Sequence, residues 1–246
     1  MKNTRKMMAL GTATVALALG AYSTVAAGSS TVATGSSTAT VAVIDQQEID
    51  TLLHMTEEEK LAHDVYVELG DTWDVNVFDR ISTAEATHLA AMQQLLDTYG
   101  IADPTDGNGP GEFTDPAFDK LYDELVTRGS TSLVEALKVG ALIEETDILD
   151  LKVALDETSS ADIVTAYTHL LAGSENHLRA FVRQLDRQGI AYEPVLMTDA
   201  EYATVLDGST GRGSSGRSAG AGRSGGTDGS PNGSNTSQQA QRGRRT

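Results

Sequence analysis

The 246-residue sequence contains no cysteine. Its absence excludes disulfide bonds, thiolate metal sites and a lipid-modified N-terminal cysteine. The sequence also lacks a comfortable membrane span at its N-terminus, because the apolar run there covers only residues 7–19. Basic residues are also few, with 18 Lys and Arg against 35 Asp and Glu, and they are unevenly distributed along the chain.

The first 27 residues have the layout of a secretory signal peptide. Three basic residues lie among the first six, the apolar run follows, and residues 25–27 are small. This pattern predicts export to the periplasm, the cell surface or the medium. An uncleaved N-terminal anchor is the alternative.

Composition divides the rest of the chain into three parts. Residues 28–45 are rich in Ser, Thr, Gly and Ala and predict a flexible tether. Residues 46–206 have helical periodicity and predict one globular domain. Residues 207–246 are rich in Gly, Ser and Arg and predict a disordered tail.

The central domain is strongly acidic. Three of the 18 basic residues precede the tether and six lie in the tail, whereas residues 1–27 and 208–246 hold only Asp228 among the 35 acidic residues. Residues 28–207 therefore contain nine basic and 34 acidic residues, a net charge of −25. Binding to nucleic acid through phosphate contacts is therefore excluded. The charge indicates either solubility or an attraction for cations.

Four long segments have the apolar spacing of amphipathic helices. They cover about residues 48–69, 75–99, 132–156 and 161–188, with an acidic first turn or capping box expected at 56–59 and Ser132 as a cap. Between the second and third lies a Gly- and Pro-rich loop at 101–116 and a short helical segment at 117–127. This connection is long enough to cross a helix bundle, whereas the other two are short and predict antiparallel neighbours. Residues 192–206 predict a short C-terminal extension.

Each long segment has polar residues in the middle of its apolar face, where burial of an unpartnered charge costs several kcal/mol. In a four-helix bundle these positions converge on one interior point. The six candidates are Glu59, Glu85, His88, Glu144, Asp147 and His177. Four converging carboxylates repel one another, at about 4 kcal/mol for a pair 4 Å apart. Two divalent ions would balance the four charges, and two imidazoles would complete the ligand set. Oxygen and nitrogen ligands without sulfur favour iron, with manganese as the alternative.

The chain resembles ferritin-like proteins of the rubrerythrin type, and most closely the family called domain of unknown function 2202. The resemblance is carried by EEEKLAHDVY (57–66), FDRISTAEATHLAAMQQLLDTYGIADP (78–104), VGALIEETDILDL (139–151) and GSENHLRAF (173–181). It implies an all-α fold, a ferritin-like four-helix bundle with one long crossover between its second and third helices. It also implies a metal site made by the six candidate residues.

One position departs from the rubrerythrin-type pattern. The fourth helix of that pattern has Glu-x-x-His, but here Ser174 precedes His177 by three residues. Either Asp147, Glu145 or water is expected to take the place of the absent carboxylate, or one of the two metal positions is expected to bind weakly. The remaining glutamates near the candidates are expected to be solvated, namely Glu57, Glu58, Glu145 and Glu175. His63 is expected to be an outer or surface residue, and Tyr66, Tyr99 and Tyr167 are expected to reach the polar centre.

These observations lead to three hypotheses. The first is an exported di-metal oxidoreductase that acts on ferrous iron, oxygen or peroxide, with an external electron donor because no cysteine-based module is present. The second is a non-catalytic surface module in which metal staples the helices. The third is a metal-free network of hydrogen bonds. Ferritin-like proteins often pair, so a homodimer is an expectation, although no outward apolar stripe specifies an interface. No catalytic residue is assigned.

Overall fold

The computed structural model describes residues 44–208, all of which belong to one compact unit. Within this range every regular element is a helix, so the all-α prediction is confirmed. The helices are α1 (Gln46–Trp73), α2 (Asn76–Tyr99), α3 (Pro116–Gly129), α4 (Leu133–Glu157), α5 (Ala161–Arg187) and α6 (Asp199–Leu206). The expected signal peptide, nearly all of the tether and nearly all of the tail lie outside the described residues.

Local capping explains where the helices begin and end. Asp45 and Glu48 form a capping box at the start of α1, so the cap is not at Thr56 as expected from the sequence. Thr56 instead lies inside the helix, where its hydroxyl donates to the Leu52 carbonyl (2.7 Å). Ser132 caps α4 as predicted, and Gly100 ends α2 with a positive φ that favours glycine. At the boundary of the predicted tether, Ile44 is buried.

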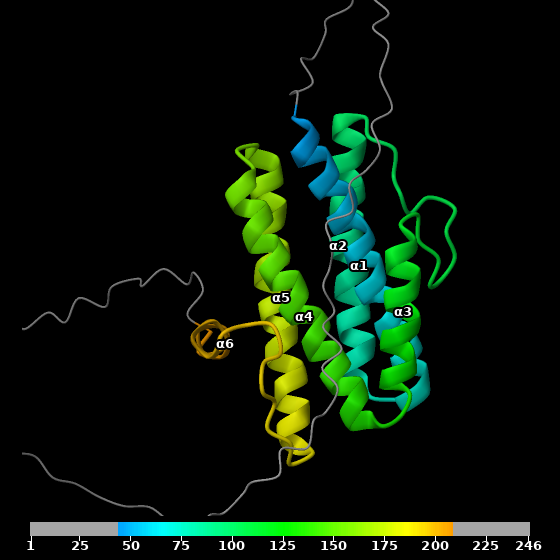
Figure 1. Cartoon of the computed structure of the whole chain (residues 1–246), viewed down its shortest axis with the longest axis vertical. Helices are drawn as coiled ribbons and strands as arrows, with labels where there is room; N and C mark the ends of the chain where they lie inside the picture. The colour runs from blue at the N-terminus through cyan, green and yellow to red at the C-terminus, as the bar shows by residue number, and fades with distance from the viewer. Residues whose placement is uncertain (1–43, 209–246) are drawn as a thin grey trace, which may run out of the picture. The chain divides into compact units, whose positions relative to one another are not determined.

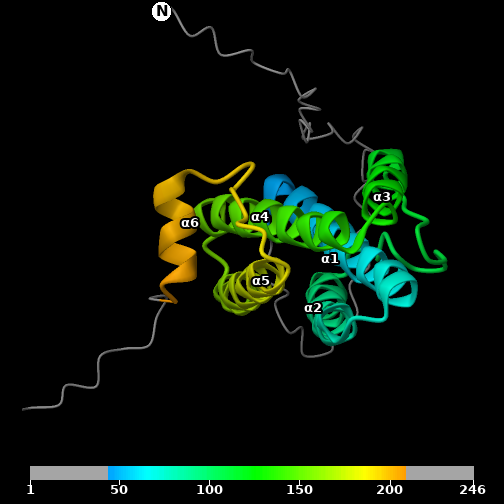
Figure 2. The same cartoon turned by 90° about the horizontal axis from the view of Figure 1, so that it is seen from below.

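The four long helices form a closed ring. α1 packs on α2, α2 on α5, α5 on α4, and α4 on α1. Figure 1 shows that the short connections after α1 and α4 join antiparallel neighbours, while the long connection between α2 and α4 runs the length of the ring and contains α3. Viewed along the helices, α3 lies outside α1, and α6 lies on the far side beside α4 and α5 (Figure 2). No helix within residues 44–208 is both long and apolar enough to cross a membrane.

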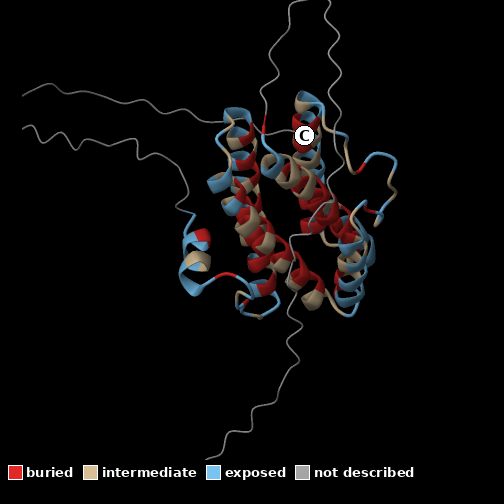
Figure 3. Cartoon of the chain, turned by 45° about the horizontal axis from the view of Figure 1, so that its top comes forward, coloured by how far each residue is buried: buried red, intermediate tan, exposed pale blue. Residues whose placement is uncertain are grey.

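Two apolar clusters fill the ring, and they are separated along its length. Buried residues face inward on all four long helices, while exposed residues line the outside (Figure 3). One cluster is centred on Tyr66, Phe78 and Phe181. The other contains Met55 and Met92. On α1, α2 and α5 the polar candidates fall between the residues of these two clusters, and on α4 they lie close to the change from the first cluster, which ends at Ile148, to the second, which begins at Leu151. The fold therefore places them in one layer of the interior.

Candidate metal centre

The structure brings the six predicted residues together. Glu59 comes from α1, Glu85 and His88 from α2, Glu144 and Asp147 from α4, and His177 from α5. The four carboxylates are at most 5% exposed. The two imidazoles are also mostly buried. Each helix contributes through its inward face, because Glu59, Glu85, Glu144 and His177 occupy positions of the apolar repeat.

Glu85 is shared between two groups of three potential ligands. In the first, His88 Nδ1 lies 2.7 Å from Glu85 Oε2 and 3.3 Å from Glu59 Oε2. In the second, His177 Nδ1 lies 2.7 Å from Glu85 Oε1 and 3.6 Å from Glu144 Oε2. Within each group the three candidate ligand atoms lie within 4.8 Å of one another. The two imidazole rings stack with centroids 5.5 Å apart. One carboxylate therefore has an oxygen in each half of a two-part site.

Several atoms of this layer lack hydrogen-bond partners. Glu59 Oε1, Glu85 Oε1, Asp147 Oδ1 and His177 Nδ1 are buried and unpartnered. For His177 and Glu85 the atoms are close, at 2.7 Å, but they do not meet the geometry of a hydrogen bond. Buried polar atoms are almost always satisfied, and an unmet one costs about 1–3 kcal/mol. A cation coordinated by these atoms would satisfy them, so the donor set fits a divalent metal.

Ser174 contacts two groups at the position where the rubrerythrin-type pattern has a carboxylate. Its hydroxyl contacts Asp147 Oδ2 and also donates to the Leu170 carbonyl (2.9 Å). Asp147 lies outside the two groups of three ligands, although its other oxygen is one of the unpartnered atoms. The serine thus holds the Asp147 carboxylate from α5 and leaves one oxygen free.

Only one of the three candidate tyrosines reaches this layer. The Tyr66 hydroxyl donates to Glu144 Oε1 (2.6 Å) and orients that carboxylate. Tyr99 instead donates to Asp162 near the start of α5 (2.7 Å). Tyr167 is buried in the apolar cluster that contains Met55 and Met92, and its hydroxyl has no partner. The prediction was therefore correct for Tyr66 and wrong for Tyr99 and Tyr167.

Burial and like charge raise the pKa of most carboxylates in the layer. Burial, and then the charge of Asp147, hold the pKa of Glu59 well above its usual range. Burial and the charge of Glu85 raise the pKa of Glu144 to about 7. Burial and the charge of Glu144 raise the pKa of Asp147 to about 8. Without a cation, these groups therefore resist ionisation together.

Glu85 and the two histidines shift in the opposite direction. Burial acts to raise the pKa of Glu85, but contacts with His177 and His88 bring it down to about 2. Burial acts to lower the pKa of His88, but Glu59 and Glu85 raise it to about 11. For His177, burial is outweighed by Glu144 and Glu85, and the pKa is about 10. Without metal, both imidazoles are therefore protonated at neutral pH, and their positive charges face the ionised Glu85 carboxylate.

Four glutamates expected to be solvated are buried, and the expectation was wrong for each. They are Glu57, Glu58, Glu145 and Glu175. Glu57 Oε1 accepts the backbone N–H groups of Thr114 (2.6 Å) and Asp115 (3.0 Å), and so holds the long connection against α1. His63 is partly exposed and contacts Asp64 (2.8 Å), as expected for an outer residue.

Gly173 is a site residue that sequence reasoning missed. A Cβ at this position would lie 2.5 Å from His88 Cε1 and 2.6 Å from Nε2, which is closer than real Cβ contacts. The absence of a side chain at Gly173 of α5 therefore makes room for the His88 imidazole from α2. The available signal was a glycine inside a helical pattern, which often indicates close packing.

Comparison with known proteins agrees with the fold. The family model described as "Uncharacterized protein domain (DUF2202)" matches residues 48–209. The chain belongs to this family. It is 44% identical over 170 residues to the uncharacterized protein MJ0754 of Methanocaldococcus jannaschii, covering 69% of this chain and 92% of that protein. A crystal structure of hypothetical protein MJ0754 superposes with a TM-score of 0.66 at 42% identity, covering 67% of this chain and 94% of that one.

Proposed function

We propose that the chain is an exported ferritin-like di-metal carboxylate protein, with iron as the first candidate metal and manganese as the alternative. The ring of four long helices and the long connection between α2 and α4 support a ferritin-like four-helix bundle with one crossover. The single observation that carries the metal proposal is the pair of ligand groups that share Glu85, with buried oxygens that no protein donor satisfies.

The ligand assignment follows from the two groups. Glu59, Glu85 and His88 would hold one ion, and Glu85, Glu144 and His177 would hold the other. Asp147 would add its free oxygen to the same layer. Two divalent ions balance four ionised carboxylates, and both imidazoles then bind in the neutral form. In the metal-free chain the pKa values of Glu59, Glu144 and Asp147 are raised, and both imidazoles are protonated. Metal binding would release these protons.

A bound pair of iron ions would supply redox chemistry toward ferrous iron, oxygen or peroxide. The protein itself orients the ligands. Tyr66 fixes Glu144 by donating to Oε1, and Ser174 fixes Asp147. The two apolar clusters exclude water from both ends of the layer. Hydrogen bonds from neighbouring side chains to metal ligands fix the orientation of those ligands in metal proteins.

We also propose where the protein acts, where its electrons come from and whether it pairs. The signal-like residues 1–27 support export, and the absence of cysteine supports an electron donor supplied by another molecule. Pairing of two copies is proposed from the ferritin-like resemblance alone.

A non-catalytic alternative has its own support. The ligands come from all four helices of the ring, so an ion there would tie the helices together whether or not it turned over a substrate. In that case metal binding would raise the melting temperature, and neither ferrous iron oxidation nor peroxide consumption would follow.

Anaerobic loading of the full chain with ferrous iron tests the proposal. We expect the central layer to bind two ions per chain, and we expect iron oxidation with new absorbance bands when oxygen is admitted. Glu85→Gln should lower affinity for both ions by at least about tenfold, since the shared ligand is lost. Glu157→Gln, an exposed position on the same helix as Glu144, is the matched control. No stoichiometric metal in the central layer would refute the proposal, and metal without turnover would select the alternative.

A further inference from the structure

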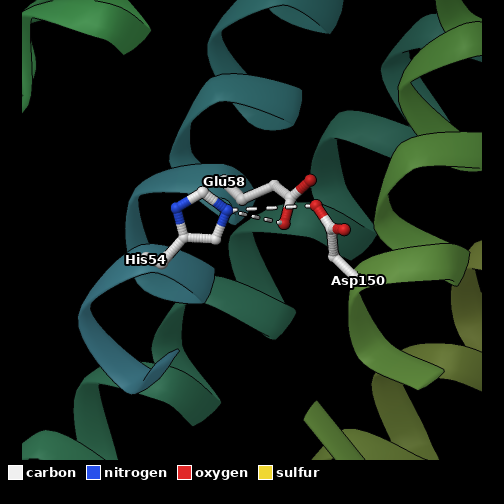
Figure 4. Close-up of side chains that lie close together, drawn as sticks. All are labelled: His54, Glu58 and Asp150. Carbon is white, nitrogen blue, oxygen red and sulfur yellow. Dashed lines mark ion pairs between the residues drawn. The ribbon is translucent and has the colours of Figure 1, made fainter. Parts of the chain in front are cut away.

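A third cluster of potential ligands lies outside the central layer. His54 and Glu58 are one turn apart on α1, and Asp150 lies opposite them on α4. Figure 4 shows the three side chains converging on one space between the two helices. His54 Nε2 lies 3.9 Å from Glu58 Oε2 and 3.9 Å from Asp150 Oδ2. The three ligand atoms lie within 4.8 Å of one another.

Glu58 provides an independent sign that something is bound there. Its residue is only 4% exposed, and its Oε2 atom is buried without a hydrogen-bond partner. This oxygen points toward the space between His54 and Asp150 (Figure 4). A separation of 3.9 Å from the imidazole is too long for a hydrogen bond, so His54 does not satisfy it. A buried carboxylate oxygen is therefore aimed into a site with no protein donor.

The distances suit a cation placed between the three atoms. Two of the separations are 3.9 Å and the third is at most 4.8 Å, so an ion in the plane of the three atoms would lie roughly 2–2.5 Å from each, within the range of divalent metal bonds to oxygen and nitrogen. The His54 ring packs against Phe118 with centroids 5.3 Å apart, which restricts its orientation. His54 and Asp150 are partly exposed, so solvent can reach the remaining coordination positions.

We propose that His54, Glu58 and Asp150 form a separate divalent-cation site, with one nitrogen and two oxygen ligands and open positions for water. This donor set suits first-row ions such as Mn²⁺, Fe²⁺ or Zn²⁺. The site joins α1 to α4 at a point next to the central layer, because Glu58 directly precedes Glu59 and Asp150 lies one turn beyond Asp147. An ion bound by His54, Glu58 and Asp150 would therefore be reachable from solvent and would lie beside the two ligand groups that share Glu85.

Counting Mn²⁺ ions bound by the full chain tests this site. Equilibrium dialysis with elemental analysis should find one ion fewer per chain, or at least a tenfold weaker third ion, in His54→Asn and in Asp150→Asn. His169→Asn, an exposed histidine on α5, is the matched control and should bind as the parent does. Circular dichroism and melting curves of each variant check that the fold is kept.

The Glu85→Gln background separates this proposal from the central one. There the remaining Mn²⁺ should show nitrogen coupling in pulsed electron paramagnetic resonance, and His54→Asn should remove that signal. If the central layer binds nothing, one ion that depends on His54 still supports the peripheral site. An unchanged ion count and unchanged coupling in both His54→Asn and Asp150→Asn would overturn it, as would an equal loss in His169→Asn.

Discussion

Adjacent glutamates on α4 show two different ways of burying a carboxylate. Glu145 Oε1 accepts from the Tyr192 hydroxyl (2.5 Å), and Oε2 accepts from the backbone N–H groups of Leu196 (2.7 Å) and Met197 (2.9 Å). Glu144 faces the central layer, where Tyr66 donates to one oxygen and the other faces His177 at 3.6 Å. The first carboxylate is satisfied by the protein, whereas the second belongs to a layer with unpartnered atoms.

The supply of hydrogen-bond donors, rather than burial, distinguishes the structural carboxylate Glu145 from the candidate ligand Glu144. Both groups are almost completely inaccessible to solvent. Glu145 has a hydrogen-bond donor at each carboxylate oxygen, and it anchors residues 192–197 to α4. The central carboxylates have one another, two imidazoles and few other donors. The proposed cations would supply the partners that the protein does not, and removing one partner at a time tests the comparison.

The largest effect is expected from Glu145→Ala. The substitution leaves the Tyr192 hydroxyl and several backbone N–H groups without an acceptor, and it should lower the free energy of unfolding by about 3 kcal/mol or more. Urea denaturation with and without metal measures this loss, which should be the same in both conditions. Glu157→Ala, at an exposed position on α4, should change stability by less than about 0.5 kcal/mol. A loss confined to the metal-loaded protein would contradict a purely structural role for Glu145.

A smaller effect, confined to metal binding, is expected from Gly173→Ala. The new methyl group would displace the His88 ring without removing any ligand, and metal affinity should fall about 10–100-fold. Titration calorimetry with Mn²⁺ measures the change. Ala172→Ser, at an exposed position on the same helix, should leave affinity unchanged. Unaltered affinity in Gly173→Ala would mean that His88 is not a ligand in its present position.

The smallest effect is expected from Asp64→Asn, which tests a second satisfied carboxylate. Burial acts to raise the pKa of Asp64, but contacts with His63 and Lys60 lower it below 3.8. A lowered pKa contributes stability above 3.8 that is lost as the pH falls through the folded value. The variant should therefore lose about 1–2 kcal/mol at pH 7.

Urea titrations at several pH values measure this dependence. The difference between Asp64→Asn and the parent should shrink progressively below pH 3.8. Asp71→Asn, an exposed position on α1, serves as the control. A loss that is constant across the pH range would show that the ionised form of Asp64 does not stabilise the fold.

Helix periodicity was enough to predict the all-α fold and to bring six residues from four helices into one layer. Glu85 and His88 could be predicted because a buried face repeats every three or four residues, and their burial follows from that spacing. A local signal also predicted the start of α4, which Ser132 caps.

The buried glutamates outside that repeat could not be predicted, because their partners come from distant segments. Glu57 is buried by the loop at Thr114, and Glu145 by the turn at Val195. Neither partner is visible in the helical pattern that contains the glutamate. His54 and Asp150 were missed for the same reason, since only the packing of α1 on α4 makes them neighbours.

Anomalous X-ray diffraction from crystals of the Mn²⁺-loaded chain tests the central claim most directly. The account predicts two peaks on opposite sides of the Glu85 carboxylate, one beside Glu59 and His88 and the other beside Glu144 and His177. A central layer that contains only water or direct hydrogen bonds under saturating metal would contradict it.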